Sequence, residues 1–198
     1  MRSERLRWMA WLAVIPLGIA MRAPFQPVTL KAESKLWFDG TSTVRSWSCK
    51  APVIDAAIDA NAAPIAKPVL AGEKAVQSAK LVFPVAKLEC GNGTMNEHMR
   101  KALKAEANPT IAFAVRSYEL AKGATATSGT LSGALTIAGM ERPVTVQAQF
   151  AEGAVGALRV TGSYDLKMTE WGVTPPKLML GTLKVGESVK VSFDLLLQ

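Results

Sequence analysis

The chain has 198 residues, enough for one domain with a sizeable core but too few for two comfortable ones. Its formal net charge is +7, and the basic residues are dispersed, without the runs interleaved with aromatic residues that would indicate a nucleic-acid-binding protein. The single histidine, His98, argues against a histidine-rich metal site, and the sequence has no nucleophile elbow, Walker loop or dinucleotide fingerprint. We therefore expect no enzyme, no metal and no cofactor.

The first residues of the chain have the pattern of a secretory signal. Three arginines form a basic start, an apolar run covers residues 8–19, and small residues lead to a cleavage position after Ala20. An uncleaved membrane anchor is the alternative. Against it, the run is shorter than the ~20 apolar residues that a helix needs to cross a bilayer, and it contains Pro16.

We predict a signal peptide over residues 1–20, a loose lead-in over 21–32 and one domain over 33–198. The protein should be periplasmic or secreted, with no membrane span after cleavage. Because such compartments are oxidising, Cys49 and Cys90 should form a disulfide. A redox or metal pair is the alternative, but it would need a C-x-x-C spacing or further ligands.

Short runs of alternating apolar and polar residues dominate from residue 34 onward, which is typical of antiparallel strands with one buried face. Less regular strands are expected at about 34–48, 50–59 and 75–88. The Ala- and Pro-rich residues 61–72 between the last two predict a surface loop.

One segment has helical periodicity instead. Residues 94–97 match a capping box and predict a helix from about 95 to 106, which Asn108-Pro109 ends. His98 projects to the edge of its apolar face, where a packing role and contact with a ligand head group are both open. Arg100 and Arg142 are further candidates for an anionic head group, although exposed basic residues usually just keep a protein soluble.

Five more alternating strands follow the helix. They cover about residues 111–115, 131–137, 144–150, 158–168 and 189–197, the last being the most regular. Seven to nine strands with one short helix predict a mainly β domain, either a closed up-and-down antiparallel barrel or a sandwich.

Inward positions of such a barrel decide whether it is filled or hollow. Small residues at positions 133, 148 and 162 leave room beside three phenylalanines, and methionine adds adaptable apolar surface. A ligand would contact the barrel interior and the helix through Met95, Met99, Phe113, Leu135, Ile137, Val146, Phe150, Val160, Met168, Val191 and Phe193. The alternative is that these side chains simply fill the space.

Three segments together resemble the YceI-like family of periplasmic, lipocalin-like barrels. They are His98-Met99 with Asn108-Pro109-Thr110-Ile111-Ala112-Phe113, then Gly133-Ala134-Leu135-Thr136-Ile137-Ala138-Gly139 with Arg142-Pro143-Val144, and Val185-Gly186-Glu187-Ser188-Val189. The resemblance implies an eight-stranded up-and-down barrel with a helix beside it, enclosing a tunnel for a polyisoprenoid or another isoprenoid-tailed lipid. It implies no catalytic residues.

Other interpretations stay open at this point. A filled barrel would serve as an interaction or stress-related module of the cell envelope without a small ligand. An outer-membrane barrel is less favoured, because few Trp and Tyr are present to form two aromatic girdles. A homodimer is an open alternative to a monomer.

Overall fold

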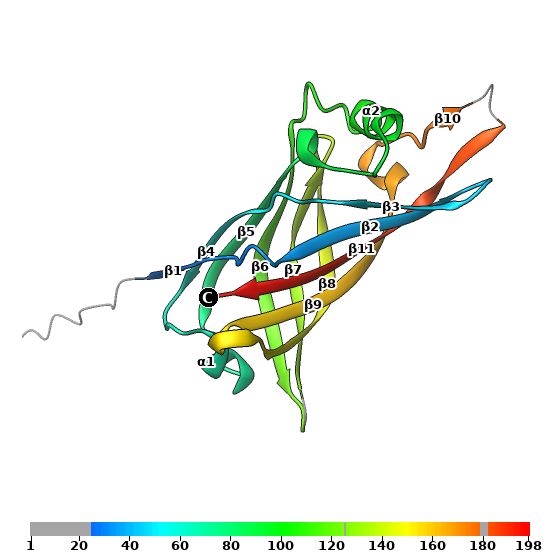
Figure 1. Cartoon of the computed structure of the whole chain (residues 1–198). Coiled ribbons are helices and arrows are strands. Elements are labelled where there is room, and N and C mark those ends of the chain that lie inside the picture. The colour runs from blue at the N-terminus through cyan, green and yellow to red at the C-terminus, as the bar shows by residue number, and fades with distance from the viewer. Residues whose placement is uncertain (1–24, 125, 179–181) are drawn as a thin grey trace, which may run out of the picture.

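The structure is a computed structural model that describes residues 25–124, 126–178 and 182–198, so the predicted signal peptide lies outside the described residues. Within these residues, one curled sheet has the strand order β1-β4-β5-β6-β7-β8-β9-β11-β2-β3, with β10 paired to β11 (Figure 1). The predicted mainly β barrel is confirmed. The described residues form eleven strands where eight were expected, and several of the additional ones are short.

All the pairings in the sheet are antiparallel, and most join strands that are consecutive in the chain. The pairings between strands that are not consecutive join β1 to β4, β9 to β11, and β11 to β2. The last of these places the first hairpin beside the last strand. The strands are β1 (Gln26–Val28), β2 (Lys35–Ser42), β3 (Ser46–Lys50), β4 (Asp55–Ala60), β5 (Val76–Pro84), β6 (Thr110–Lys122), β7 (Thr127–Ile137), β8 (Met140–Glu152), β9 (Leu158–Lys167), β10 (Lys177–Leu178) and β11 (Leu183–Leu197). The helices are α1 (Ala66–Leu70) and α2 (Gly93–Ala102), with 3-10 turns η1 (Val85–Lys87), η2 (Ala154–Gly156) and η3 (Met168–Trp171).

The predicted strand at 34–48 is a hairpin of β2 and β3. The turn between them is held by Ser42, whose amide donates to the Arg45 carbonyl at 2.8 Å and whose hydroxyl accepts from the Arg45 amide at 3.1 Å. Neither Gly nor Pro marks this turn, because a serine side chain stabilises it instead. Without a Gly or Pro signal for the turn, the sequence pattern predicted one strand where the structure has two.

The segment expected to be a loose lead-in takes part in the sheet. Strand β1 pairs with β4, and two residues later Leu30 forms a bridge with Leu197 of β11. The Thr29 amide donates to the Gln198 carbonyl at 2.8 Å. The segment thus joins β4 to β11 at one end of the barrel, which satisfies backbone groups that would otherwise remain open.

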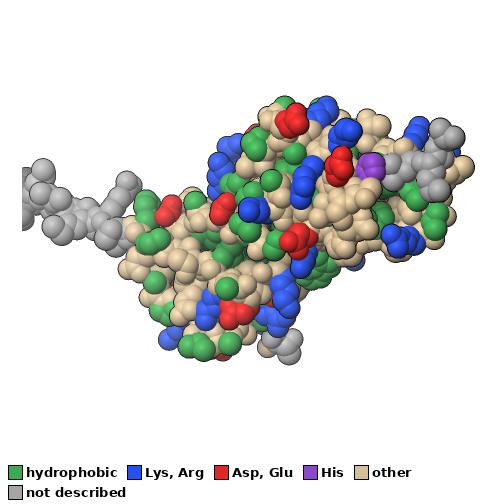
Figure 2. Space-filling view, turned by 45° about the horizontal axis from the view of Figure 1, so that its top comes forward, with side chains coloured by type: hydrophobic (Ala, Val, Ile, Leu, Met, Phe, Trp, Pro, Cys, Tyr) green, Lys and Arg blue, Asp and Glu red, His purple; other side chains and the backbone are tan. Residues whose placement is uncertain are grey.

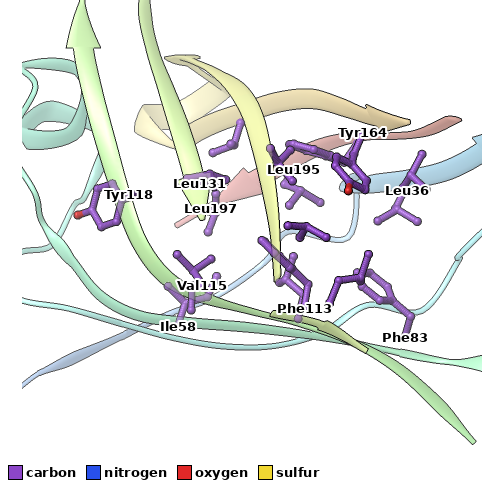
Figure 3. A pocket seen from close by; sticks show the side chains of 18 of the residues that line it. Leu36, Ile58, Phe83, Phe113, Val115, Tyr118, Leu131, Tyr164, Leu195 and Leu197 are labelled. Atoms are coloured by element: carbon purple, nitrogen blue, oxygen red, sulfur yellow. The ribbon is translucent and has the colours of Figure 1, made fainter. Parts of the chain in front are cut away.

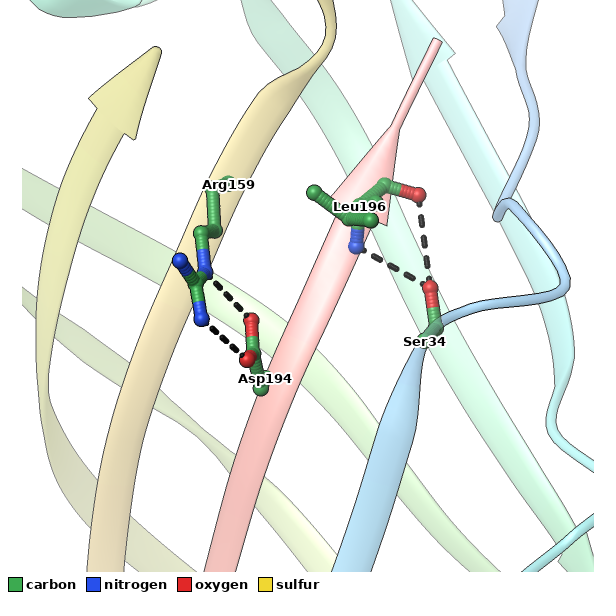
Figure 4. A network of polar contacts seen from close by, with 4 residues as sticks. All are labelled: Ser34, Arg159, Asp194 and Leu196. Carbon is green, nitrogen blue, oxygen red and sulfur yellow. Dashed lines mark hydrogen bonds and ion pairs between the residues drawn. The ribbon is translucent and has the colours of Figure 1, made fainter. Parts of the chain in front are cut away.

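The start of β2 and the end of β11 are fixed by polar contacts on the barrel exterior (Figure 4). The Ser34 hydroxyl accepts from the Leu196 amide at 3.0 Å and donates to the Leu196 carbonyl at 3.4 Å. Beside it, the Arg159 guanidinium donates to both carboxylate oxygens of Asp194, at 2.8 and 2.6 Å. This bidentate pair crosses from β9 to β11 and lowers the pKa of Asp194.

A second set of contacts, here called the seam, joins β3 to the chain segment that follows β5. Lys50 and Glu89 exchange backbone hydrogen bonds of 2.7 and 3.0 Å, and their side chains form an ion pair at 3.2 Å. The predicted disulfide is confirmed directly beside them, with Cys49 bonded to Cys90. It fastens the edge strand β3 to the segment that leads into α2.

Helix α1 lies within residues 61–72, so the prediction of a surface loop was wrong. Ile65, Ala66 and Val69 are all buried and belong to a core cluster at one end of the barrel. Their spacing puts them on one face of a short helix. Pro68 is tolerated because the amides of a first helical turn have no intrahelical partner to lose.

Helix α2 begins and ends earlier than predicted. Its cap is Asn92, whose side-chain oxygen accepts from the Met95 amide at 3.1 Å, instead of the predicted capping box. The helix ends at Ala102 because Lys104 adopts a left-handed conformation with φ 53°. The Ala105 amide then donates to the Arg100 carbonyl at 3.0 Å, which closes the last turn.

Candidate functional site

The alternation of the strands directs one set of apolar side chains into the barrel. In Figure 3 side chains from different strands, among them Val115, Phe113 and Leu195, point toward a common space. This space is a cavity of about 230 Å³. Its lining is hydrophobic apart from two tyrosines, Tyr118 and Tyr164, so the interior offers almost no hydrogen bonds to a ligand.

The two tyrosines differ in their polar contacts. The Tyr118 hydroxyl accepts from the Val76 amide at 3.0 Å and donates to the Val76 carbonyl at 3.1 Å, which ties β6 to the start of β5. Burial raises the pKa of Tyr118. Burial and the nearby Glu170 carboxylate raise the pKa of Tyr164, whose hydroxyl has no hydrogen-bond partner among the described residues. Tyr164 is therefore the polar group of this lining that remains open to a bound molecule.

Glycines let large rings lie flat against the barrel wall. A Cβ atom built on Gly162 would lie 2.5 Å from Cζ of Phe193, and one on Gly133 would lie 2.8 Å from Cε2 of Phe113. Gly162 lies directly opposite Phe193, whereas Gly133 lies opposite Val115, two residues from Phe113 on the same face of the sheet. Because the rings occupy the space above the glycines, they line the cavity instead of crossing it.

A second cavity, of about 330 Å³, lies beneath α2. Helix α2, the β2–β3 hairpin and η3 surround it, and Met95, Met99 and His98 face it from the helix. The disulfide lies in its wall, with the Cys90 sulfur 3.6 Å from the Met99 sulfur. We refer to this space as the mouth cavity, and to the one lined by apolar side chains and two tyrosines as the deep cavity.

Two indole rings are fixed in the wall of the mouth cavity. Nε1 of Trp171 donates to the Leu135 carbonyl at 3.2 Å, and Nε1 of Trp47 donates to the Thr41 carbonyl at 3.1 Å. Trp171 is only 2% exposed, and Trp47 meets Phe38 edge-on at 6.3 Å between ring centroids. With their N–H groups already satisfied, both indoles present apolar surface to the cavity.

The two cavities adjoin along the barrel axis. Five residues line both of them, namely Phe38, Ile111, Ile137, Leu166 and Val191. Figure 3 shows the deep cavity extending from Tyr164 and Leu36 toward Tyr118 and Ile58. The arrangement is an elongated apolar space with a mixed polar and apolar outer part.

All eleven residues expected to contact a ligand border this space. The deep cavity is lined by Phe113, Leu135, Ile137, Val146, Phe150, Val160, Val191 and Phe193, and the mouth cavity by Met95, Met99, Met168, Ile137 and Val191. Their assignment as ligand contacts stays a prediction.

The three predicted head-group contacts are not brought together. His98 lines the mouth cavity, whereas Arg100 and Arg142 line neither cavity. Arg142 is exposed on β8, and Arg100 has a buried Nε without a hydrogen-bond partner among the described residues. Arg45, which sequence reasoning missed, lines the mouth instead. The face shown in Figure 2 carries basic and acidic side chains interspersed, not one block of a single charge.

Sequence reasoning also missed the side chains that close the deep cavity. Val69 belongs to α1 and Ile65 is the N-cap residue before it, both inside the segment expected to be a loop. They line the cavity at the end opposite the mouth. Their spacing of four residues was the only available signal, and the Ala- and Pro-rich composition obscured it.

Residues 25–124, 126–178 and 182–198 contain no group of three or more His, Cys, Asp or Glu side chains placed to hold a metal ion. Over the same part of the chain, no helix is both long and apolar enough to cross a bilayer.

Comparison with known proteins assigns the fold. A family model described as "YceI-like domain" matches residues 27–197. Comparison with curated proteins gives no match.

Solved structures with a similar fold come from several bacteria. BcnA of Burkholderia cenocepacia is 20% identical, with a TM-score of 0.67 over 86% of this chain and 99% of that one. A polyisoprenoid binding domain from Saccharophagus degradans is 14% identical, with a TM-score of 0.61 over 86% and 97%. The YCEI protein of Campylobacter jejuni is 17% identical, with a TM-score of 0.56 over 75% and 82%. At these identities the likeness shows the fold alone.

Proposed function

This chain belongs to the YceI-like family, and we propose that its barrel binds an elongated apolar molecule, a polyisoprenoid or an isoprenoid-tailed lipid, without catalysing a reaction. The protein would sequester or carry this molecule in the periplasm. The solved domain from Saccharophagus degradans, described as polyisoprenoid binding, supports this choice of ligand class.

The observation that carries the proposal is that the two cavities adjoin, with five lining residues in common. A globular domain normally packs its interior with few voids larger than a water molecule. Here two cavities lined mainly by apolar side chains, from strands β2 to β9 and β11 among other elements, together extend from α2 toward α1. A linear hydrocarbon matches both the length and the chemistry of such a space.

Affinity would come from burial of the hydrocarbon tail of the ligand. Each methylene moved from water into the cavity contributes up to ~0.8 kcal/mol, offset by the cost of association and of ordering the ligand. A long tail can therefore bind tightly without specific polar contacts. The flexible side chains of Met95 and Met99 in α2 can adapt their shape to an irregular hydrocarbon tail.

The polarity of the two cavities favours one direction of binding. The tail would occupy the deep cavity, where Tyr164 is the only unpaired polar side chain among the described lining residues. The head group would remain in the mouth cavity near His98 and Arg45. Binding in the opposite direction would bury a polar group without partners, which costs free energy.

A blocking variant tests the proposal. Val191 lies at the junction of the two cavities, so Val191→Trp should obstruct the passage. Purified protein freed of lipid would be mixed with a long polyprenyl alcohol and examined by native mass spectrometry. We expect the wild type to form a one-to-one complex and the variant to lose it.

The matched control lies one residue away. Lys190 is exposed and points outward from the same strand, so Lys190→Trp should leave binding unchanged. Overpacking costs about 1–3 kcal/mol, and a thermal melt of each variant confirms that it is folded. Equal binding by the wild type and a folded Val191→Trp variant would contradict the proposal, as would a wild type that binds no such lipid.

A further inference from the structure

The deep cavity ends against α1. Ile65 and Val69 line it while being only 3% and 1% exposed, so solvent does not reach the cavity past them. Ile58, Leu158 and Leu197 complete this end and are likewise buried. The elongated space is therefore blind at the α1 end and opens toward α2.

The α1 segment is held firmly in this position. The Thr127 hydroxyl donates to the Leu70 carbonyl at 2.9 Å, which fastens the end of α1 to the start of β7. At the base of the segment, the Asn61 amide donates to the Ala75 carbonyl at 2.9 Å. Val69 belongs to the same buried cluster as Phe150 of β8. The segment is thus tied to the barrel by hydrogen bonds at both ends and by packing between them.

The adjoining wall is fixed as well. Tyr118 lines the deep cavity, and its two hydrogen bonds to the Val76 backbone join β6 to the beginning of β5. Figure 3 shows Tyr118, Ile58 and Leu197 at one end of the lining, away from Tyr164 and Leu36. A ligand tail pressing against this end would have to break these contacts to advance.

We propose that Ile65 and Val69 are specificity-determining residues that form an end stop and set the longest isoprenoid tail the barrel accepts. This inference rests on the proposed function, because it assumes that a tail enters from the mouth. A tail that reaches the stop while its head group remains in the mouth cavity is fully buried. Each further isoprene unit would leave apolar carbon in water and so gain no affinity.

The test uses a series of polyprenyl alcohols that differ by one isoprene unit. Ile65→Ala with Val69→Ala removes as many carbon atoms as one isoprene unit contains, and Ile65→Phe extends the stop into the cavity. Native mass spectrometry of the full chain with an equimolar mixture of the alcohols gives the preferred length for each protein. We expect the double variant to prefer a tail longer by one unit, with roughly tenfold enrichment of that alcohol, and Ile65→Phe to prefer a shorter one.

The control removes equal volume elsewhere. Ile111→Ala with Val191→Ala enlarges the junction of the two cavities, so it should change affinity for all lengths without moving the preferred length. If the double variant at the stop does not fold, the shift caused by Ile65→Phe decides the question. An unchanged preferred length in folded stop variants that still bind overturns the end stop and leaves the proposed function standing. A wild type that binds none of the alcohols overturns both.

Discussion

At the α1 end of the barrel, side chains such as Leu158 and Val69 line the end of the deep cavity and are almost completely buried, whereas the mouth cavity at the α2 end is bordered by exposed residues such as Arg45 and Thr94. The same strands run through both regions. What differs is the covering element: α1 inserts apolar side chains into the barrel, and α2 lies across it and leaves a cavity beneath.

The two ends are also held together differently. The α1 end relies on packing, on the Leu30–Leu197 bridge and on the exterior Arg159–Asp194 pair. The α2 end relies on the Cys49–Cys90 disulfide and the Lys50–Glu89 pairing. A barrel with a cavity at one end can therefore be held there by covalent and backbone links in addition to side-chain packing, such as the buried cluster around Trp171.

The largest expected effect is loss of the covalent link. The sequence separation of 41 residues gives the disulfide a stabilisation of about 4 kcal/mol on the chain-entropy model. We expect Cys49→Ala with Cys90→Ala to lose about that much free energy of unfolding, measured by urea denaturation. The wild type in excess reductant should behave like the variant. A variant as stable as the oxidised wild type would mean that the backbone pairing alone holds the seam.

A matched pair of leucine substitutions compares a fully buried position with a partly buried position of the deep-cavity lining. Leu158 is 2% exposed at the α1 end, so Leu158→Ala should cost about 3 kcal/mol by losing contacts and creating a cavity. Leu36 lines the deep cavity and is only partly buried, so Leu36→Ala should cost about 1 kcal/mol. Both values come from urea denaturation of lipid-free protein. Equal losses would show that the two regions are packed alike.

The smallest effect concerns the exterior pair at the α1 end. The hydrogen bond from Arg159 lowers the pKa of Asp194 below its ordinary value of 3.8, so the carboxylate stabilises the fold above that value and the contribution is lost as pH falls through the lowered pKa. The melting temperature of the wild type should exceed that of Asp194→Asn at about pH 6, and the difference should shrink below about pH 4. A difference that is constant over this range would contradict the assignment.

The second half of the chain could be predicted from its sequence, because its strands alternate with period two. The facing of Phe113, Val146 and Phe193 followed directly from that alternation, since neighbouring residues of a strand point to opposite faces. The disulfide was predicted from the number of cysteines and from the expectation of an oxidising compartment. In the first half, the Ser42 turn and the short helix α1 carry no strong local signal, so their residues were misassigned.

The head-group candidates show a further limit. His98 faces the mouth cavity, but Arg100 is two residues further along α2 and Arg142 lies exposed on β8. Charge and residue type do not say where a side chain points in space. Arg45 reaches the mouth because the β2–β3 hairpin folds beside β11, a pairing between the two ends of the chain.

The sequence by itself determined the class of fold, the inward face of the later strands and the pairing of the cysteines, because each depends on local periodicity or on composition. Only the tertiary structure decided that the barrel is open at α2 and closed at α1. That difference depends on how far each covering segment enters the barrel, and Ile65 and Val69 gain this role only when β4, β5 and β8 surround them. Packing between segments that are distant in the chain produces no periodic pattern in the sequence. The length of the cavity therefore could not be inferred before the fold was known.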